Sequence, residues 1–396
     1  MDIGHPELVA KLVARIKRDG PLSFADFMES ALYDPECGYY MTQGPRIGRE
    51  GDYYTSLDVH PVFARLIGRQ VAQAADTIAS NGDFTIVEVG AGKGLLAGYL
   101  LDSYRREKAA FLSRIRYILV ERSPAMIAAQ QNHLRPLLEA GVRITWAPDL
   151  RAFPAASVTG MILSNELVDA FPVHCVVMRP LGLREIYVGW ADGKFIEIEA
   201  PPFAPTLQEY FDCVGVSLEI GQRAEVNLPA LEWMRQAGTI LRRGLVLTID
   251  YGHSATDLYA PARKAGTLLC YHRHQVSDSP YVRVGRQDMT AHVDFTSLAL
   301  AGRDAGLEVT GFTNQLHFLM GLGIESAFEG VDPESPESVA MRNLLKPDGM
   351  GTTYKVLIQH KGMPAPRLDG LQSRPFFLDA LQAGRATART MEAATR

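Results

Sequence analysis

The sequence contains little cysteine, and its cysteines are far apart. The four, Cys37, Cys175, Cys213 and Cys270, show no C-x-x-C spacing. Because zinc ribbons and disulfide frameworks use closely spaced cysteines, we expect no metal site and no structural disulfide. Such a chain suits a reducing compartment, so we expect a cytoplasmic protein.

Long apolar runs and an excess of basic residues are also absent. No run approaches the ~18 apolar residues of a membrane-spanning helix, and the acidic Asp2 and Glu7 do not fit a signal or transit peptide. The formal net charge of -5 argues against a general nucleic-acid-binding face, because phosphate contacts need Lys and Arg. We therefore expect no membrane span, no secretion and no nucleic-acid partner.

The composition is that of a globular protein, with 47% hydrophobic and 21% charged residues in a chain of 396. Apolar segments that read as strands alternate with helical patterns. The strands are expected at 84–89, 116–120, 142–146, 158–163 and 244–249, and the helices between them include 94–108 and 124–140. This alternation predicts an α/β fold with a doubly wound parallel sheet, whose ligands bind beyond the carboxyl ends of the strands.

The alternation stops between residues 173 and 242. Segments 175–178, 185–190 and 195–198 read as antiparallel strands, and two helical stretches follow at 207–213 and 229–241. We expect an N-terminal helical segment and loop at 1–80 that contributes to the active site, and a core formed by 81–172 and 243–362. The block at 173–242 is expected to be an inserted cap, residues 266–293 an irregular segment, and 363–396 a peripheral tail.

Three glycines follow the first core strand. Gly90, Gly92 and Gly94 lie between that strand and a helical pattern, which is the arrangement that brings backbone N–H groups to a charged cofactor. The spacing is G-x-G-x-G, not the G-x-G-x-x-G of dinucleotide folds, and no Lys-Ser or Lys-Thr pair of a P-loop follows. With Glu88 two residues before the turn, the sequence predicts that Glu88, Gly90, Ala91, Gly92 and Gly94 bind the amino acid end of S-adenosylmethionine.

Polar residues at the ends of the following strands extend this cofactor site. Glu121 is placed to bind ribose hydroxyls, and Asp149, with Leu150 beside it, to bind the adenine. Asn165 ends the fourth core strand, and the hydroxyl of Thr55 lies in an irregular segment at 46–58. We expect all five to contact the cofactor, although a solvated carboxylate at a helix start remains an alternative for Glu121.

Several segments together resemble the MidA family of methyltransferases, which includes a mitochondrial complex I assembly factor. The segments are 27–35, 38–40, 51–56, 88–94, 164–174, 250–252, 266–268 and 287–295. The resemblance implies a seven-stranded methyltransferase sheet with a substrate-covering region, S-adenosylmethionine as cofactor, and methylation of an arginine in a complex I subunit. The chain departs from the family pattern at Leu57–Asp58, where Pro-Glu is usual, and at Phe63–Ala64, where Phe-Gly is usual.

Acidic residues just past the fourth strand suit the methylation of arginine. A guanidinium stays protonated in proteins, and carboxylates can bind its N–H groups and orient the reacting nitrogen. We expect Glu166 and Asp169, three residues apart, to lie on one side of a helical turn as catalytic groups, with His174 relaying a proton. The structural alternative is that the two carboxylates stabilise the N-terminus of a helix by interacting with its macrodipole.

Two further motif residues, Tyr251 and His292, are expected to contact the substrate, although a structural histidine before a helix is the alternative for His292. Three functions remain open for the chain. They are methylation of a protein arginine, methylation of a small-molecule acceptor on the same sheet, and S-adenosylmethionine binding without turnover by an assembly factor. The partner expected for the first is a protein such as a complex I subunit, and a homodimer is compatible with the sequence. A dehydrogenase is opposed by the loop spacing.

Overall fold

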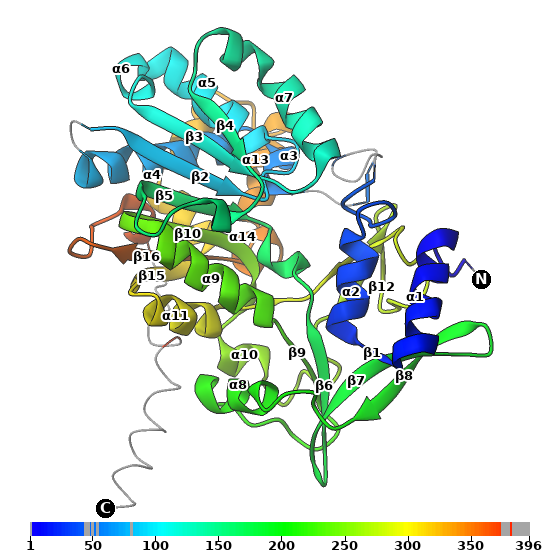
Figure 1. Cartoon of the computed structure of the whole chain (residues 1–396). Helices are drawn as coiled ribbons and strands as arrows, with labels where there is room; N and C mark the ends of the chain where they lie inside the picture. Colours follow the sequence, from blue (N-terminus) through cyan, green and yellow to red (C-terminus); the bar gives the residue numbers. More distant parts are fainter. Residues whose placement is uncertain are drawn as a thin grey trace, which may run out of the picture.

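The computed structural model describes residues 2–42, 48, 51–52, 55–79, 82–373 and 381. Figure 1 shows two lobes, a larger one built on a central sheet and a smaller one that carries the N-terminus. Parts of two predicted segments lie outside the described residues. These are residues 46–47, 49–50 and 53–54 of the irregular loop, and 374–380 and 382–396 of the tail.

The larger lobe contains the predicted sheet, with strand order β15-β16-β10-β5-β2-β3-β4. Its strands are β2 Phe84–Val89, β3 Ile115–Val120, β4 Ile144–Ala147, β5 Val158–Asn165, β10 Leu241–His253, β15 Glu308–Asn314 and β16 Tyr354–Lys361, and the short β14 Val293–Asp294 adds beside β10. The strands from β4 to β10 pair in parallel, and β16 is antiparallel to both β10 and β15. The predicted doubly wound, seven-stranded fold is confirmed.

Helices cover both faces of this sheet, because successive residues of its strands face opposite sides. On β2, Ile86 packs into the core beneath helices α4 and α5, whereas its neighbour Val87 packs into the core beneath α9 and α11. The helices of the chain are α1 Pro6–Asp19, α2 Phe24–Tyr33, α3 Ser56–Val59, α4 Val62–Ile78, α5 Leu95–Glu107, α6 Ala109–Leu112, α7 Pro124–Glu139, α8 Thr206–Val214, α9 Leu228–Ile240, α10 Ala255–Leu258, α11 Phe295–Asp304, α12 Gln315–Gly321, α13 Pro336–Leu345 and α14 Met350–Thr353. Short 3-10 turns are η1 Leu150–Ala152, η2 Val168–Ala170, η3 Ile324–Phe328 and η4 Asp369–Leu371.

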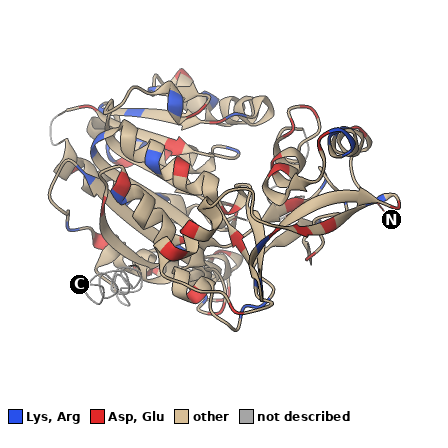
Figure 2. Ribbon diagram, turned by 60° about the horizontal axis from the view of Figure 1, so that its bottom comes forward, with Lys and Arg blue, Asp and Glu red and all other residues tan. Residues whose placement is uncertain are grey.

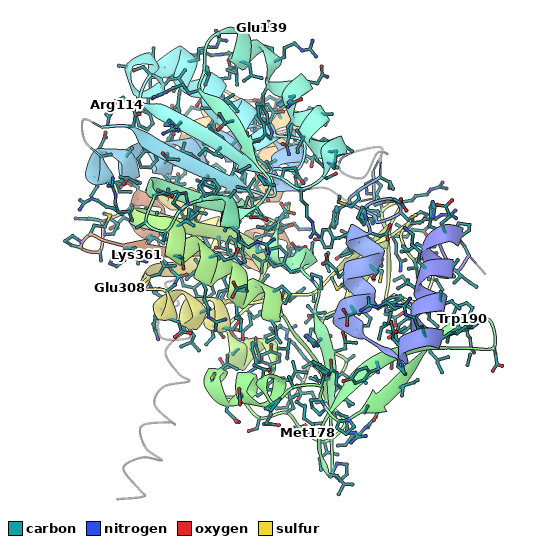
Figure 3. All side chains as sticks on the ribbon, viewed as in Figure 1. Arg114, Glu139, Met178, Trp190, Glu308 and Lys361 are labelled. Atoms are coloured by element: carbon teal, nitrogen blue, oxygen red, sulfur yellow. The ribbon has the colours of Figure 1, made fainter. Side chains whose placement is uncertain are left out.

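The smaller lobe joins the N-terminal helices to the inserted strands. Its sheet has the order β1-β7-β6-β9, with β8 beside β7. The strands are β1 Leu22–Ser23, β6 His174–Arg179, β7 Gly182–Ala191, β8 Lys194–Ala200 and β9 Arg223–Val226. Leu22 pairs with Val188 of β7, so the segment before α2 becomes part of the inserted sheet. Trp190 of β7 lies in this lobe, whereas Arg114 and Glu139 lie in the larger one (Figure 3).

Apolar side chains of α1 and α2 hold the smaller lobe together. Leu8 and Leu12 of α1 and Phe27 of α2 share one buried cluster with Ile186 and Val188 of β7. Ser23 caps α2 by accepting a hydrogen bond from the N–H of Asp26, as its position before the helix predicts. Helix α9 packs instead on the larger sheet, although it belongs to the inserted block in sequence. The domain boundaries given above stay a prediction.

The segment at 266–293, expected to be irregular, contains a small sheet with the order β12-β11-β13. Its strands, β11 Leu269–His272, β12 Gln275–Ser277 and β13 Asp288–Thr290, are three or four residues long. Strands of this length carry no readable alternation, so the sequence prediction was wrong here. Within the described residues, none of the helices is both long and apolar enough to cross a membrane. Figure 2 shows Lys and Arg interspersed with Asp and Glu over both lobes.

The close approach of β2, β5 and β10 depends on Gly160, which has φ +153°. A Cβ atom there would lie 1.9 Å from the carbonyl oxygen of Thr85 on β2. We therefore expect Gly160→Ala to lower the free energy of unfolding by about 3 kcal/mol or more, measured by urea denaturation. The control Gly82→Ala, where a Cβ meets nothing within 4 Å, should change it by less than about 0.5 kcal/mol. Equal effects of the two changes would contradict this account of the sheet.

Candidate active site

A cavity of about 470 Å³ lies at the carboxyl ends of β2, β3, β4 and β5. Its volume falls within the roughly 300–1,000 Å³ of small-molecule sites. The sequence-predicted residues on its wall are Thr55, Glu88, Gly90, Ala91, Gly92, Glu121, Asp149, Leu150, Asn165 and Glu166. Both lobes contribute to the wall, because Tyr33 and Tyr40 reach it from the smaller lobe and Trp233 from α9.

The glycine turn forms one side of this cavity. Gly90, Gly92 and Gly94 have φ values of +71°, +52° and +79°, a region that side-chain-bearing residues rarely adopt. A Cβ on Gly90 would lie 2.6 Å from Cδ1 of Leu167, so the turn also has no room for a side chain at this point. Gly94 does not line the cavity and instead caps the N-terminus of α5. The turn therefore brings the backbone of Gly90, Ala91 and Gly92 to the cavity wall beside the N-terminus of α5, the kind of position at which N–H groups bind a negative charge. The N–H groups of Gly90 and Gly94 themselves donate to the carbonyls of Val120 and Ala91.

Glu88 lies beneath the turn in a buried position. Its carboxylate accepts a hydrogen bond of 2.8 Å from the hydroxyl of Tyr117 on β3. Burial raises the pKa of Glu88 to about 7, although the Tyr117 hydrogen bond opposes the shift. A cationic group in the cavity would favour the ionised form of this carboxylate.

Glu121 follows β3, and it is fixed by two donors. It accepts a hydrogen bond of 2.9 Å from the N–H of Ser123 and one of 3.3 Å from Nε2 of Gln130. Burial raises the pKa of Glu121, so its environment is not that of a fully solvated carboxylate. Gln130 of α7 also donates to the carbonyl of Gly92 over 2.8 Å and accepts from Trp146. This glutamine, which the sequence did not single out, couples the glycine turn to Glu121.

Asp149 lies on the cavity wall, but its carboxylate already has partners. It accepts 2.7 Å from the N–H and 2.9 Å from Nη2 of Arg151, and the Arg151 hydrogen bond lowers the pKa of Asp149. Leu150, buried to 3% exposure, begins the 3-10 turn η1 and offers an apolar surface. The structure thus brings both predicted residues to the cavity, with the Asp149 side chain paired to a neighbouring guanidinium.

Thr55 caps the short helix α3 together with Asp58. The hydroxyl of Thr55 donates to the Asp58 carboxylate over 2.6 Å, and its backbone N–H donates to the same oxygen over 3.2 Å. The side chain and backbone of the two residues therefore form a capping box. Asp58, which stands where the MidA pattern has Glu, is short enough to close this box.

Glu166 is held in a strained conformation at the end of β5, with φ +52°. Its Oε1 accepts hydrogen bonds from the N–H of Ser56, at 3.0 Å, and from Nδ2 of Asn165, at 3.1 Å. Its Oε2 accepts a hydrogen bond of 2.8 Å from the hydroxyl of Tyr354. Burial raises the pKa of Glu166 to about 7. Three donors from three segments thus fix this carboxylate on the cavity wall.

Asp169 is not on the cavity wall but is buried beside it in η2. Its Oδ2 accepts a hydrogen bond from the hydroxyl of Tyr251, and its buried Oδ1 has no hydrogen-bond partner among the described residues. Burial raises the pKa of Asp169 to about 6. Glu166 therefore lines the cavity whereas Asp169 does not, and the left-handed conformation of Glu166 means that the two do not follow one another along a helical turn as predicted.

Three other predicted residues lie away from the cavity wall. His174 is on β6 of the smaller lobe, where its Nδ1 lies 2.8 Å from the Glu185 carboxylate, so its placement gives no support to a proton relay. Tyr251 packs edge-on against His292, with ring centroids 5.4 Å apart, and stands next to Asp169. Burial lowers the pKa of His292 to about 4, so this imidazole is neutral near pH 7.

The cavity also contains aromatic residues that the sequence did not assign. Tyr33 and Tyr40 stack with centroids 5.4 Å apart, and the Arg122 guanidinium lies 3.5 Å above the Tyr33 ring. The hydroxyl of Tyr40 donates to Asp288 over 2.6 Å, and burial raises the pKa of Asp288 to about 7. Tyr33, Tyr40 and Asp288 fall in segments that match the MidA pattern. The resemblance therefore marked these residues but did not indicate what they do.

Comparison with known proteins agrees with this geometry. Residues 66–313 match the model of a family described as S-adenosyl-L-methionine-dependent methyltransferases. The mitochondrial protein arginine methyltransferase NDUFAF7 of Mus musculus is 29% identical over 366 residues, which cover 85% of this chain and 79% of the mouse protein. Its Drosophila melanogaster homologue is 26% identical over 401 residues, covering 92% and 87% of the two chains.

Solved structures give the same result. A Burkholderia thailandensis protein crystallised with S-adenosyl-homocysteine is 31% identical, with a TM-score of 0.85, over 93% of this chain and 95% of that one. A native crystal structure of an uncharacterized superfamily protein from the same species is 32% identical, with a TM-score of 0.81 and the same coverage.

The buried carboxyls predict a fall in stability between pH 6.5 and 8. In the folded chain the pKa values of Glu88, Glu166 and Asp288 are about 7, above those of the unfolded chain, so the folded state binds more protons in this range. We expect the free energy of unfolding of the ligand-free protein to decrease by about 2 kcal/mol, measured by urea denaturation at several pH values. Glu88→Gln removes one of the three groups and should reduce this decrease by about a third. A profile that rises in both proteins would contradict these pKa directions.

Glu121 provides a direct test of the cofactor side of the cavity. Glu121→Gln keeps the size of the side chain but removes the charge that strengthens hydrogen bonds to ribose hydroxyls. We expect the dissociation constant for S-adenosyl-homocysteine to rise at least tenfold, or about 1.4 kcal/mol, by calorimetry. The control is Glu139→Gln, a change at the exposed end of α7 (Figure 3), which should leave binding unchanged. Binding by Glu121→Gln within twofold of the unchanged protein would exclude the assigned role.

Proposed function

Since this chain belongs to the family of S-adenosyl-L-methionine-dependent methyltransferases, we propose that it methylates an arginine side chain of a protein. The names of the mouse and fly relatives, both protein arginine methyltransferases, support arginine as the acceptor. The observation that carries the proposal is the Glu166 carboxylate, which is fixed on the cavity wall with buried Asp169 close by.

The residues of the cavity fit S-adenosylmethionine in charge and in shape. The turn at Gly90–Gly94 would receive the carboxylate of its amino acid end, and Glu88 its ammonium group. Glu121 would accept from the ribose hydroxyls, while Leu150 and the backbone near Asp149 would contact the adenine. The bound cofactor supplies an electrophilic methyl group on a sulfonium, and the protein contributes position and electrostatics.

Glu166 is the group that we assign to the acceptor guanidinium. Three donors already fix its carboxylate, so it needs little reorganisation when the substrate binds. A carboxylate offers about four acceptor sites, which leaves room for one more N–H group. We assign a second acceptor to Asn165, whose buried Oδ1 has no hydrogen-bond partner among the described residues.

We assign two tasks to Asp169 and Asp288. They balance the positive charge of the acceptor guanidinium, and they accept the proton that methyl transfer releases. Transfer of a methyl cation to a guanidinium nitrogen releases one proton and leaves a methylated guanidinium with the same charge. Burial raises the pKa of Asp169 to about 6 and that of Asp288 to about 7, values suited to accepting a proton near neutral pH. Tyr251 is assigned as a positioning residue, because its hydroxyl donates to one oxygen of Asp169, while the buried Oδ1 has no hydrogen-bond partner among the described residues.

The aromatic wall suits an arginine as well. Tyr33 already stacks with a guanidinium, that of Arg122, at 3.5 Å from its ring centroid. Phe171 and Trp233 line the cavity and pack edge-on with centroids 6.4 Å apart. The rings of Phe171 and Trp233 can hold the apolar stem of an arginine while carboxylates bind its charged end.

The protein acceptor that we propose is a subunit of respiratory complex I. Its support is the resemblance to the MidA family, whose members include a complex I assembly factor, and the naming of the NDUFAF7 relatives as mitochondrial. A matrix location in a eukaryote, or a cytoplasmic one in a bacterium, would give access to such a subunit. A homodimer stays a prediction.

The role of Glu166 can be tested with labelled S-adenosylmethionine and a protein extract or complex I subunits. We expect Glu166→Gln to lower the rate of label transfer to protein by about 100-fold or more, because a fixed charge beside the acceptor is lost. Binding of S-adenosyl-homocysteine should stay within about threefold, since the groups assigned to the cofactor are intact. Glu139→Gln is again the matched control.

The site of the label separates the alternatives. Label on arginine, found by acid hydrolysis of the protein fraction, supports the proposal. Label confined to small metabolites would instead show that a small-molecule acceptor is used. Full transfer to protein arginine by Glu166→Gln would refute the role given to this carboxylate while leaving arginine methylation intact.

A further inference from the structure

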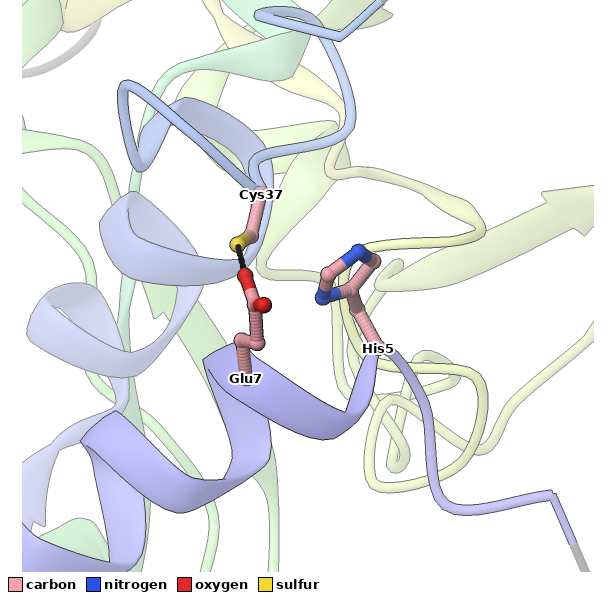
Figure 4. Close-up of side chains that lie close together, drawn as sticks. All are labelled: His5, Glu7 and Cys37. Atoms are coloured by element: carbon pink, nitrogen blue, oxygen red, sulfur yellow. Dashed lines mark hydrogen bonds between the residues drawn. The ribbon is translucent and has the colours of Figure 1, made fainter.

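A group of three side chains with metal-ligating atoms lies in the smaller lobe, away from the cavity. His5, Glu7 and Cys37 each place one such atom within 4.8 Å of the other two (Figure 4). His5 and Glu7 stand at the start of α1, and Cys37 comes from the turn that follows α2. The fold thus joins ligands that are about thirty residues apart, which is why cysteine spacing gave no sign of them.

Two atoms in this group have poor hydrogen bonding without an ion. Nδ1 of His5 is buried and has no hydrogen-bond partner among the described residues. The Cys37 thiol is buried, and its contact with Oε2 of Glu7 is 3.6 Å, a weak hydrogen bond. A buried nitrogen without a partner costs about 1–3 kcal/mol. An ion that accepted both atoms as ligands would remove this cost.

One of the three distances already suits zinc. Zn–S bonds of about 2.3 Å and Zn–N or Zn–O bonds of about 2.0–2.2 Å in a tetrahedron place ligand atoms roughly 3.3–3.6 Å apart. The separation of 3.6 Å between Cys37 and Glu7 has this value, and rotation of the exposed Glu7 and half-buried His5 side chains can adjust the other two. Thiolate, imidazole and carboxylate are also the three ligand types that zinc takes in proteins.

We propose that His5, Glu7 and Cys37 bind one Zn²⁺ ion, with water as the fourth ligand. Binding replaces the S–H bond of Cys37 with a Zn–S bond and releases the proton to the solvent. The ion fastens the start of α1 to the turn before Tyr40, whose side chain lines the cavity. Ion pairs of Lys11 with Asp34 and Glu36 already join α1 to this turn. The N–H of His5 donates to the carbonyl of Val284, which ties the start of α1 to the segment before β13.

Cobalt provides the test, because Co²⁺ occupies zinc sites and its bond to a thiolate has a charge-transfer absorption. The full chain, freed of metal with a chelator, should develop this absorption with one equivalent of Co²⁺ and lose it when Zn²⁺ is added. Cys37→Ser and His5→Gln should abolish it, and Glu7→Gln should weaken binding at least tenfold. Cys213→Ser removes an exposed cysteine of α8 and is the matched control that should keep the signal.

Each variant should first bind S-adenosyl-homocysteine like the unchanged protein, which shows that it is folded. Absence of the thiolate band in the unchanged protein, or a band that persists in Cys37→Ser, would overturn the proposal. Binding of several equivalents without dependence on His5 would count against it in the same way. The test has no dependence on methyl transfer, so its outcome is separate from that of the proposed function.

Discussion

The arrangement of the site depends on one buried carboxylate, that of Asp250, which lies three residues before the end of β10. Its Oδ2 accepts the N–H groups of Leu167, Val168 and Asp169 at 3.1, 2.9 and 3.4 Å. These bonds fix the turn that follows β5, and with it the left-handed conformation of Glu166. They also hold Leu167 against Gly90, so the same interaction sets the Glu166 turn and the glycine turn on the cavity wall. Burial of Asp250 raises its pKa, a cost that three backbone donors offset in part.

The smaller lobe forms part of the cavity wall that the methyltransferase sheet alone would leave open. The N-terminal strand β1 pairs with the inserted strands, and α1 and α2 share one apolar core with them, although the two segments are far apart in sequence. From this lobe Tyr33 and Tyr40 reach the cavity, and the Tyr33 hydroxyl donates to the carbonyl of Ala170 over 2.9 Å. The lobes therefore meet at the turn that carries Glu166 and Asp169. An acceptor would be enclosed by aromatic faces on one side and carboxylates on the other.

Much of the fold and of the candidate site could be predicted from the sequence, because the residues that indicate them are close together in the chain. The strand before Gly90 and the helix after Gly94 are adjacent in sequence, and the strand ends at Glu121 and Asn165 follow from the same alternation. Contacts between distant segments gave no such signal. The hydrogen bond from the Tyr354 hydroxyl to Glu166 joins residues that are 188 positions apart in the sequence. The hydrogen bonds from the turn after β5 to Asp250 join residues more than 80 positions apart. His174 lies close to Glu166 in sequence, yet β6 carries it into the other lobe.

The central claim is that one cavity places a sulfonium methyl group beside the Glu166 carboxylate. A crystal structure of the protein with S-adenosyl-homocysteine tests it most directly. The account predicts the amino acid end at the Gly90–Gly94 turn, the ribose at Glu121, and the sulfur facing Glu166 across a gap that a guanidinium nitrogen could fill. A ligand bound with its sulfur turned away from Glu166, or outside this cavity, would contradict the account.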